Sequence, residues 1–96
     1  MLYTYDQIKD ILEPVFKRYS VRSAFLFGSY AKGLQTERSD IDIIVDSGLR
    51  GIEFFGLLED VIDALGKDVD LLDVSQIKQG SKIQEETKRT GLRIYG

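Results

Sequence analysis

The spacing of apolar residues predicts an amphipathic helix at the start of the chain. Thr4 followed three residues later by Gln7 is typical of a capping box at a helix N-terminus. The helix is expected to continue to about Tyr19, although Pro14 inside it removes one backbone hydrogen bond and leaves its straightness open. Five apolar residues recur at three- and four-residue intervals, the spacing of one helix face: Ile8, Ile11, Leu12, Val15 and Phe16.

Two apolar runs that follow predict buried strands. Residues 21–27 are β-branched and aromatic and stop at Gly28. Residues 41–45 form the second run, and the turn-forming residues 46–48 end it. Both lengths and compositions are typical of strands rather than helices.

The second half of the chain continues this alternation. A broad apolar stripe predicts a helix over residues 51–65, with Gly66 at the C-terminal cap. Residues 69–73 predict a third short strand, residues 78–90 a polar helical segment, and residues 92–95 an edge strand. The order helix, strand, strand, helix, strand, helix predicts an α/β (α+β) fold with a small mixed β-sheet flanked by helices. We find no linker or repeat, so residues 1–96 are expected to form a single domain.

Composition narrows the possible chemistry. The 96 residues are 43% hydrophobic and 30% charged, which is typical of a globular protein. No apolar run approaches the roughly 20 residues that a spanning helix needs, and no targeting segment is evident, so we expect a cytoplasmic protein with no membrane partner. The chain has neither cysteine nor histidine, which excludes a thiol nucleophile and a serine–histidine triad. A net charge of -3 argues against direct nucleic-acid binding by phosphate neutralisation, but it is compatible with a hard cation.

The loop after the first strand is the first candidate for chemistry. Gly28 lets the backbone turn sharply and approach a ligand, and the following amides and the Ser29 hydroxyl can act as phosphate donors. Lys32 would bring positive charge to the same place. Glycine–serine turns are common, so the same residues also fit an ordinary turn in which Ser29 caps a short helix.

Asp40 and Asp42 form the second candidate. Residues two apart in a strand face the same side, so both carboxylates project together and suit a cation that takes oxygen ligands. The chain contains ten aspartates, and about one Asp-x-Asp pair is expected by chance. Asp68 and Asp70 form another such pair. Two features favour the first: aspartate is a poor strand former, and Ile44 on the same side indicates a face that is partly covered.

Asp70 is the third candidate, in the short strand 69–73. If that strand lies beside 41–45, Asp70 completes a three-carboxylate cluster able to hold one or two magnesium ions. A lone aspartate at such a position is more often a strand-end or turn residue. Asp73 points to the opposite face of a regular strand and is the weaker candidate.

Taken together, Gly28-Ser29, Lys32-Gly33, residues 39–42 and residues 69–71 resemble the signature of the polymerase-beta-type nucleotidyltransferase superfamily. The chain is most similar to the minimal nucleotidyltransferase (MNT) domains, antitoxins of HEPN/MNT pairs. The resemblance implies the nucleotidyltransferase fold, with ATP as substrate and Mg²⁺ as cofactor. It assigns nucleotide binding to Gly28, Ser29, Lys32 and Ser39, and it assigns metal binding and catalysis to Asp40, Asp42 and Asp70. Lys32 departs from the arginine common in the family and lacks its bidentate fork.

The resemblance also implies a partner. The expected activity is transfer of AMP from ATP to a hydroxyl, by resemblance a tyrosine, of a HEPN-domain toxin. Two alternatives stay open: an antitoxin that binds the toxin without catalysis, and nucleotidyl transfer to a small molecule. The assembly also stays open between a homodimer and a hetero-oligomer.

Overall fold

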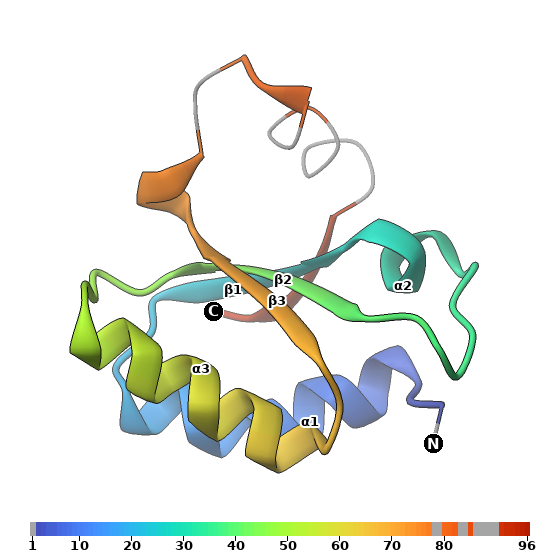
Figure 1. The fold of residues 1–96 in the computed structure, drawn as a ribbon, viewed down its shortest axis with the longest axis horizontal. Coiled ribbons are helices and arrows are strands. Elements are labelled where there is room, and N and C mark those ends of the chain that lie inside the picture. Colours follow the sequence, from blue (N-terminus) through green and yellow to red (C-terminus); the bar gives the residue numbers. More distant parts are fainter. Residues whose placement is uncertain (1, 78–79, 83–84, 86–90) are drawn as a thin grey trace.

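The computed structural model describes residues 2–77, 80–82, 85 and 91–96. Figure 1 shows a four-stranded sheet with two long helices on one of its faces. The predicted helical segment 78–90 falls largely outside the described residues. None of the described helices is both long and apolar enough to cross a membrane.

The first helix, α1 (Tyr5–Arg18), begins at the predicted capping box. The Gln7 amide donates to Thr4 Oγ1 over 3.2 Å, and the Thr4 amide donates to Gln7 Oε1 over 2.9 Å. These two bonds satisfy amide groups that the helix itself cannot pair. Pro14 lies inside the helix without ending it.

The sheet is mixed, as predicted. Its strands are β1 (Ser23–Phe27), β2 (Ile41–Asp46), β3 (Val69–Asp73) and β4 (Leu92–Tyr95), in the order β3-β2-β1-β4. β1 pairs antiparallel with β2 and β4, whereas β2 and β3 run parallel. The parallel pair is joined through the second long helix, α3 (Ile52–Leu65), which ends at Gly66 with φ +64°. The predicted edge strand at the C-terminus is confirmed as β4.

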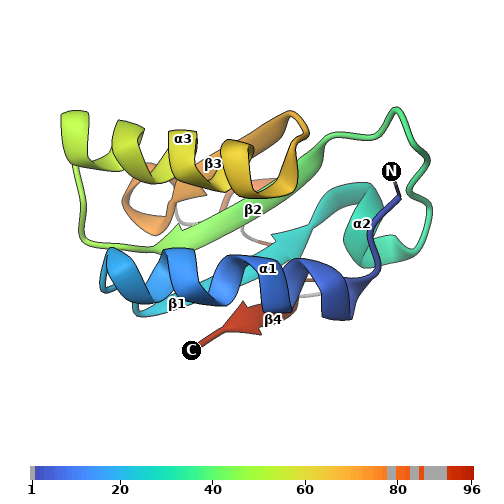
Figure 2. The same ribbon diagram turned by 90° about the horizontal axis from the view of Figure 1, so that it is seen from below.

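The main core lies between the sheet and the pair of helices α1 and α3. Figure 2 shows these helices side by side in front of the strands. Their buried apolar faces meet one face of every strand, so the helical and strand periodicities point to the same interior. The largest fully buried side chains of this core are Phe16, Ile8, Leu12, Leu26, Ile41, Ile43, Leu57, Leu65 and Ile94.

The opposite face of the sheet is also partly apolar. Ile44 is only 1% exposed and Phe27 9% exposed, yet neither belongs to the main core. Antiparallel pairing places Phe27 opposite Asp42 and Phe25 opposite Ile44. The expectation that the face carrying Asp42 and Ile44 is partly covered is therefore confirmed, since Ile44 is buried and Asp42 half-buried. The Asp42 carboxylate lies on the same face as the apolar residues Phe27 and Ile44.

Two short elements were not predicted as separate segments. The helix α2 (Gly28–Lys32) follows β1 immediately, and a 3-10 turn (Val74–Gln76) follows β3. Contacts of α2 with β1 and β2 place it at the end of the sheet where β1 finishes and β2 starts. This end carries the candidate site.

Candidate active site

Gly28 lies directly against the carboxylate of Asp42. Its φ is +70°, in the left-handed region that favours glycine. A Cβ atom built on Gly28 would lie 2.3 Å from Asp42 Oδ2 and 3.2 Å from Asp42 Cγ. The backbone of the loop and the side chain of β2 are thus so close that only a hydrogen atom fits between them. This approach joins the first and second sequence candidates in space.

Ser29 is the second residue of α2 rather than its cap. The N-terminal cap is Phe27, which makes no side-chain capping bond. The Ser29 carbonyl accepts the Leu34 amide over 2.9 Å, which closes the helix at Gly33, whose φ is +72°. Within the described part of the chain the half-buried Ser29 hydroxyl has no hydrogen-bond partner. The hydroxyl is therefore available to a ligand at this end of the sheet.

Lys32 is the last residue of α2 and is exposed. It lies three residues after Ser29, so the two side chains occupy neighbouring positions on the same helix face. The structure thus places the lysine on the element that carries Gly28 and Ser29.

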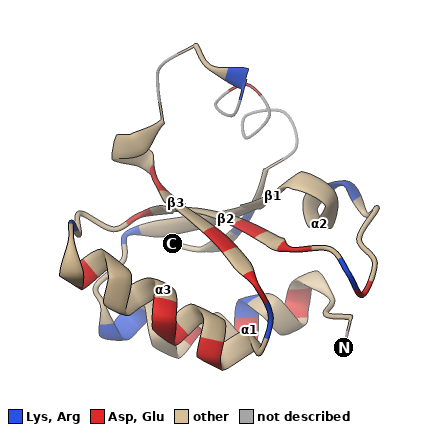
Figure 3. Cartoon of the chain, viewed as in Figure 1, with Lys and Arg blue, Asp and Glu red and all other residues tan. Residues whose placement is uncertain are grey.

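The parallel pairing of β2 with β3 brings two predicted carboxylates into register. Asp42 and Asp70 are direct partners across the two strands, as Ile44 and Leu72 are two residues further on. Partners in neighbouring strands lie about 4.8 Å apart. Figure 3 shows the acidic segments of β2 and β3 adjacent to each other, towards α2. The condition set for Asp70, that the third strand lies beside the second, is therefore met.

Asp40 is placed differently from the other two aspartates. It precedes β2 by one residue and is exposed, as Asp70 is, whereas Asp42 is half-buried. Among the residues that the structure describes, no three acidic side chains approach closely enough to form a metal cluster. The expected cluster of Asp40, Asp42 and Asp70 is therefore not drawn together in this arrangement. Like-charged carboxylates repel at short range, and the exposed side chains of Asp40 and Asp70 are not held towards Asp42 by any packing that the structure describes.

These carboxylates nevertheless fit a hard divalent cation. The donor set consists of carboxylate oxygens, which Mg²⁺ prefers, and the two strand residues lie on one face. Gly28 leaves room for the Asp42 carboxylate where any other residue would displace it. The residues that would hold the cation are Asp42 and Asp70, with Asp40 at the start of β2.

Ser39 belongs to a tight turn that leads into β2. Its hydroxyl accepts the Thr36 amide over 2.9 Å and lies 3.3 Å from Thr36 Oγ1, and its own amide donates to the Thr36 carbonyl over 3.0 Å. The structure thus gives Ser39 a role in shaping the loop before Asp40. Because a hydroxyl that accepts can still donate, this role is compatible with nucleotide contact.

Asp73 is a structural residue, as its position on the opposite face suggested. It is 4% exposed, and its carboxylate accepts the Ser47 amide over 3.0 Å, the Ser47 hydroxyl over 2.6 Å and the Ser75 amide over 2.9 Å. Burial raises the pKa of this carboxyl, but the hydrogen bonds from Ser47 and Ser75 outweigh burial and lower the pKa to about 2. Asp73 therefore stays charged and ties the end of β2 to the turn after β3.

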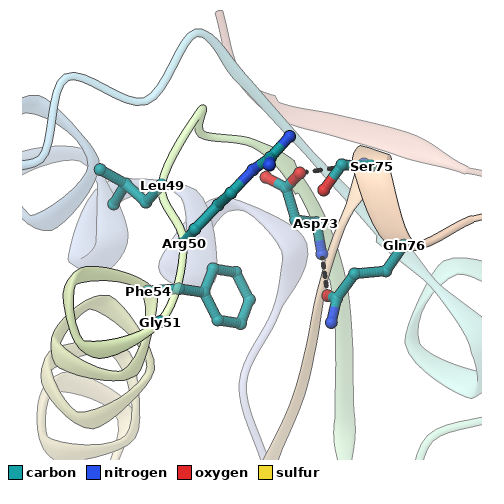
Figure 4. Close-up of a pocket in the computed structure, with 7 residues that line it drawn as sticks. All are labelled: Leu49, Arg50, Gly51, Phe54, Asp73, Ser75 and Gln76. Atoms are coloured by element: carbon teal, nitrogen blue, oxygen red, sulfur yellow. Dashed lines mark hydrogen bonds between the residues drawn. The ribbon is translucent and has the colours of Figure 1, made fainter.

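A cavity of about 250 Å³ lies beside Asp73, at the far end of β2 and β3 from the candidate site. Figure 4 shows Phe54, Ser75 and Gln76 among the residues around it. The Ser75 amide donates to the Asp73 carboxylate, and the Asp73 amide donates to Gln76 Oε1. None of the predicted site residues lines this cavity. It is separate from the group formed by Gly28, Asp42 and Asp70.

Lys67 is the residue at this end that sequence reasoning missed. Its Nζ donates to the Tyr30 hydroxyl and to the Glu37 carbonyl, each over 3.1 Å. No local motif marks a lone lysine between a helix and a strand. Only the folded arrangement reveals that the lysine contacts both α2 and the loop before β2.

Comparison with known proteins identifies the family. The sequence profile of the family described as "Polymerase beta, Nucleotidyltransferase" matches residues 7–96. The protein adenylyltransferase MntA of Thermococcus cleftensis is 38% identical over 89 residues, which cover 82% of this chain and 86% of that protein. A relative from Methanocaldococcus jannaschii, provisionally named a protein adenylyltransferase, is 43% identical over 81 residues, covering 78% of this chain and 83% of the relative.

Solved structures show the same fold. A toxin–antitoxin complex crystallised with AMP-PNP contains a chain that matches with a TM-score of 0.78 and 27% identity, over 92% of this chain and 73% of that one. The complex of a tri-AMPylated Shewanella oneidensis HEPN toxin with its MNT antitoxin gives a TM-score of 0.73 at 23% identity, over 97% of this chain and 73% of that one. Because the family profile covers nearly the whole chain and the folds coincide, this protein belongs to the polymerase beta nucleotidyltransferase family.

Proposed function

We propose that this protein transfers AMP from ATP to a tyrosine hydroxyl of a HEPN-type toxin and thereby acts as its antitoxin. The observation that carries the proposal is the meeting of Gly28, Asp42 and Asp70 at one end of the sheet. The similarity to a protein adenylyltransferase of 38% identity and to a chain from a toxin–antitoxin complex with AMP-PNP supports the same activity.

The site residues have two roles, nucleotide binding and metal binding. The amides at the start of α2, the Ser29 hydroxyl and Lys32 contact the triphosphate, and Ser39 contacts the nucleotide from the turn before β2. Asp40, Asp42 and Asp70 hold Mg²⁺, which supplies positive charge against the phosphate oxygens and the leaving group when it is bound. Asp70, exposed at the outer strand β3, is the carboxylate best placed to meet an acceptor that arrives from outside.

The chemical step is an in-line displacement. The acceptor oxygen forms a bond to the α-phosphorus of ATP as the bond from that phosphorus to the bridging oxygen breaks, and pyrophosphate leaves. The acceptor proton passes to the Asp70 carboxylate. Such a step depends mainly on positioning and electrostatic stabilisation, so a chain without histidine can perform it.

A protein acceptor fits the exposure of the site. Asp40 and Asp70 are both exposed, so this domain leaves the acceptor side of the site open to a partner. The partner must therefore provide much of the surface that orients the hydroxyl. A small-molecule acceptor would have to be held without such help.

The proposal is tested by incubating the protein with ATP, Mg²⁺ and the HEPN-type protein encoded beside it, and then weighing the toxin by mass spectrometry. We expect the toxin to gain the mass of one or more AMP groups, located on tyrosine by fragmentation. A toxin without added mass at saturating ATP would contradict the proposal. The double variant Asp40→Asn, Asp42→Asn should lose both the modification and the neutralisation; if neutralisation persists, the antitoxin acts by binding alone.

A further inference from the structure

Lys67 is anchored at the junction between α3 and β3. It follows the helix cap Gly66 and precedes β3 by two residues. The side chain is half-buried, and its Nζ lies 5.6 Å from the centre of the Tyr30 ring as well as 3.1 Å from the Tyr30 hydroxyl. A surface lysine usually keeps its ammonium group in water, so this placement calls for an explanation.

The two acceptors of Lys67 belong to segments that carry site residues. Tyr30 is the neighbour of Ser29 in α2 and is a residue of the main core, only 5% exposed. Glu37, whose carbonyl accepts the second bond, lies in the turn that leads to Asp40. The lysine is separated from these acceptors by 37 and 30 residues respectively. One side chain thus connects α2 with the loop before β2.

The loop has few other attachments to the rest of the protein. Within the described residues, the remaining hydrogen bonds of residues 35–38 are those between Thr36 and its neighbours Arg38 and Ser39. The next attachment is the Ile41 amide, which donates to the Asp68 carbonyl over 3.2 Å where β2 begins. Lys67 therefore holds the tip of the turn, whereas the Asp68 carbonyl holds its end.

We infer that Lys67 is a positioning residue, which fixes the distance between the triphosphate-binding helix α2 and the metal-binding aspartates that follow the loop. This inference rests on the proposed function for its catalytic consequence, but its structural consequence can be measured without turnover. Loss of the ammonium group should free the turn, so that Ser29 and Asp40 no longer meet one nucleotide in a fixed geometry. A misplacement of about 1 Å at such a site can cost about 100-fold in rate.

The test compares Lys67→Met, which keeps the aliphatic stem and removes the ammonium group, with Lys9→Met. Lys9 is exposed on α1, so the second variant removes the same charge away from the loop. Hydrogen exchange is followed at the amides of Thr36 and Ser39, whose bonds hold the turn, and at the core amide of Val61. In Lys67→Met we expect about tenfold faster exchange at the turn and unchanged exchange at Val61, since local opening is independent of global unfolding.

Binding and turnover supply the functional readouts. Lys67→Met should bind AMP-PNP with Mg²⁺ about tenfold more weakly and lower kcat more than it raises KM for ATP, because alignment is lost in addition to contact. Lys67→Arg, which can still donate to both acceptors, should restore most of the affinity. Tyr30→Phe removes one acceptor only and should give an intermediate effect, smaller in the Lys67→Met background than alone.

Three results would overturn the inference. Exchange at the turn and AMP-PNP affinity that both match wild type would show that Lys67 holds nothing in place. Exchange that is faster at Val61 to the same degree would show that Lys67 stabilises the whole fold and does not position the turn. An arginine variant as impaired as the methionine variant would show that the hydrogen bonds of Lys67 are not the cause. A wild-type protein that transfers no AMP would refute the proposed function instead, while the exchange measurements would still decide the role of Lys67.

Discussion

The replacement Gly28→Ala is expected to disable the candidate site by displacing the carboxylate of Asp42. The new Cβ would lie 2.3 Å from Asp42 Oδ2, whereas ordinary contact begins near 3.4 Å. One of the two groups must therefore move by about 1 Å, which at a catalytic centre costs about 100-fold. That loss corresponds to about 2.7 kcal/mol of transition-state stabilisation.

A second cost of the alanine comes from the backbone and has to be separated from the first. A non-glycine residue in the left-handed region costs roughly 1–2 kcal/mol. Gly33, at the other end of α2, provides the matched control because its φ is also positive, at +72°. Apart from its chain neighbours, no heavy atom of the described residues lies within 4 Å of a Cβ atom placed on it. Gly33→Ala thus carries the backbone strain without the collision with Asp42.

The assay measures the free energy of unfolding by urea denaturation and AMP transfer per folded molecule. Both alanine variants should lose roughly 1–2 kcal/mol of stability, because both place an alanine in the left-handed region. Only Gly28→Ala should lose about 100-fold in AMP transfer. Equal activity of the two variants would refute the reasoning. A second result would also refute it. Gly28→Ala would have to cost clearly more stability than Gly33→Ala, and this extra cost would have to persist in a background where Asp42→Ala has removed the carboxylate.

Four further predictions concern the acidic residues and the metal that they would hold. Asp73→Asn should destabilise the fold by roughly 2–3 kcal/mol, since it weakens hydrogen bonds to a charged group; the urea midpoint measures this loss. The folded pKa of Asp73 lies near 2, below its unfolded value of about 3.9. The contribution of Asp73 to the free energy of unfolding is therefore present above pH 4 and disappears as the pH falls towards 2. A pH titration of stability should show this component in wild type and not in the variant. Asp70→Asn should lower AMP transfer by about 100-fold or more at unchanged melting temperature, whereas Asp68→Asn, which makes the same change of charge two residues earlier, should retain activity. Magnesium at about 100 times its dissociation constant should add about 2.7 kcal/mol to the unfolding free energy, and a melting curve that EDTA does not lower would contradict the metal site.

The sequence was sufficient wherever local signals determine the structure. The capping box of Thr4 and Gln7, the apolar stripe of α1 and the alternation along β2 all depend on residues within a few positions of one another, and the structure confirms them. The helix α2 was harder, because a five-residue helix after a buried strand has no periodicity to detect. The contact between Lys67 and Glu37 could not be predicted for a different reason, since the two residues are remote in sequence.

The candidate site itself depends on strand register, which the sequence does not encode locally. An Asp-x-Asp pair is expected about once by chance in this chain, and both pairs precede or enter strands. What distinguishes Asp42 is the antiparallel pairing that puts Phe27 opposite it, because the next residue is then Gly28, whose positive φ turns the backbone onto the carboxylate. Asp70 gains its place only through the parallel pairing with Asp42. Gly28 can pack against Asp42, fourteen residues away, only because it has no side chain. Two aspartates that are close in sequence by chance place no such restriction on a third residue. The close approach of Gly28 to Asp42 is therefore a better criterion for a functional pair than the spacing of the aspartates.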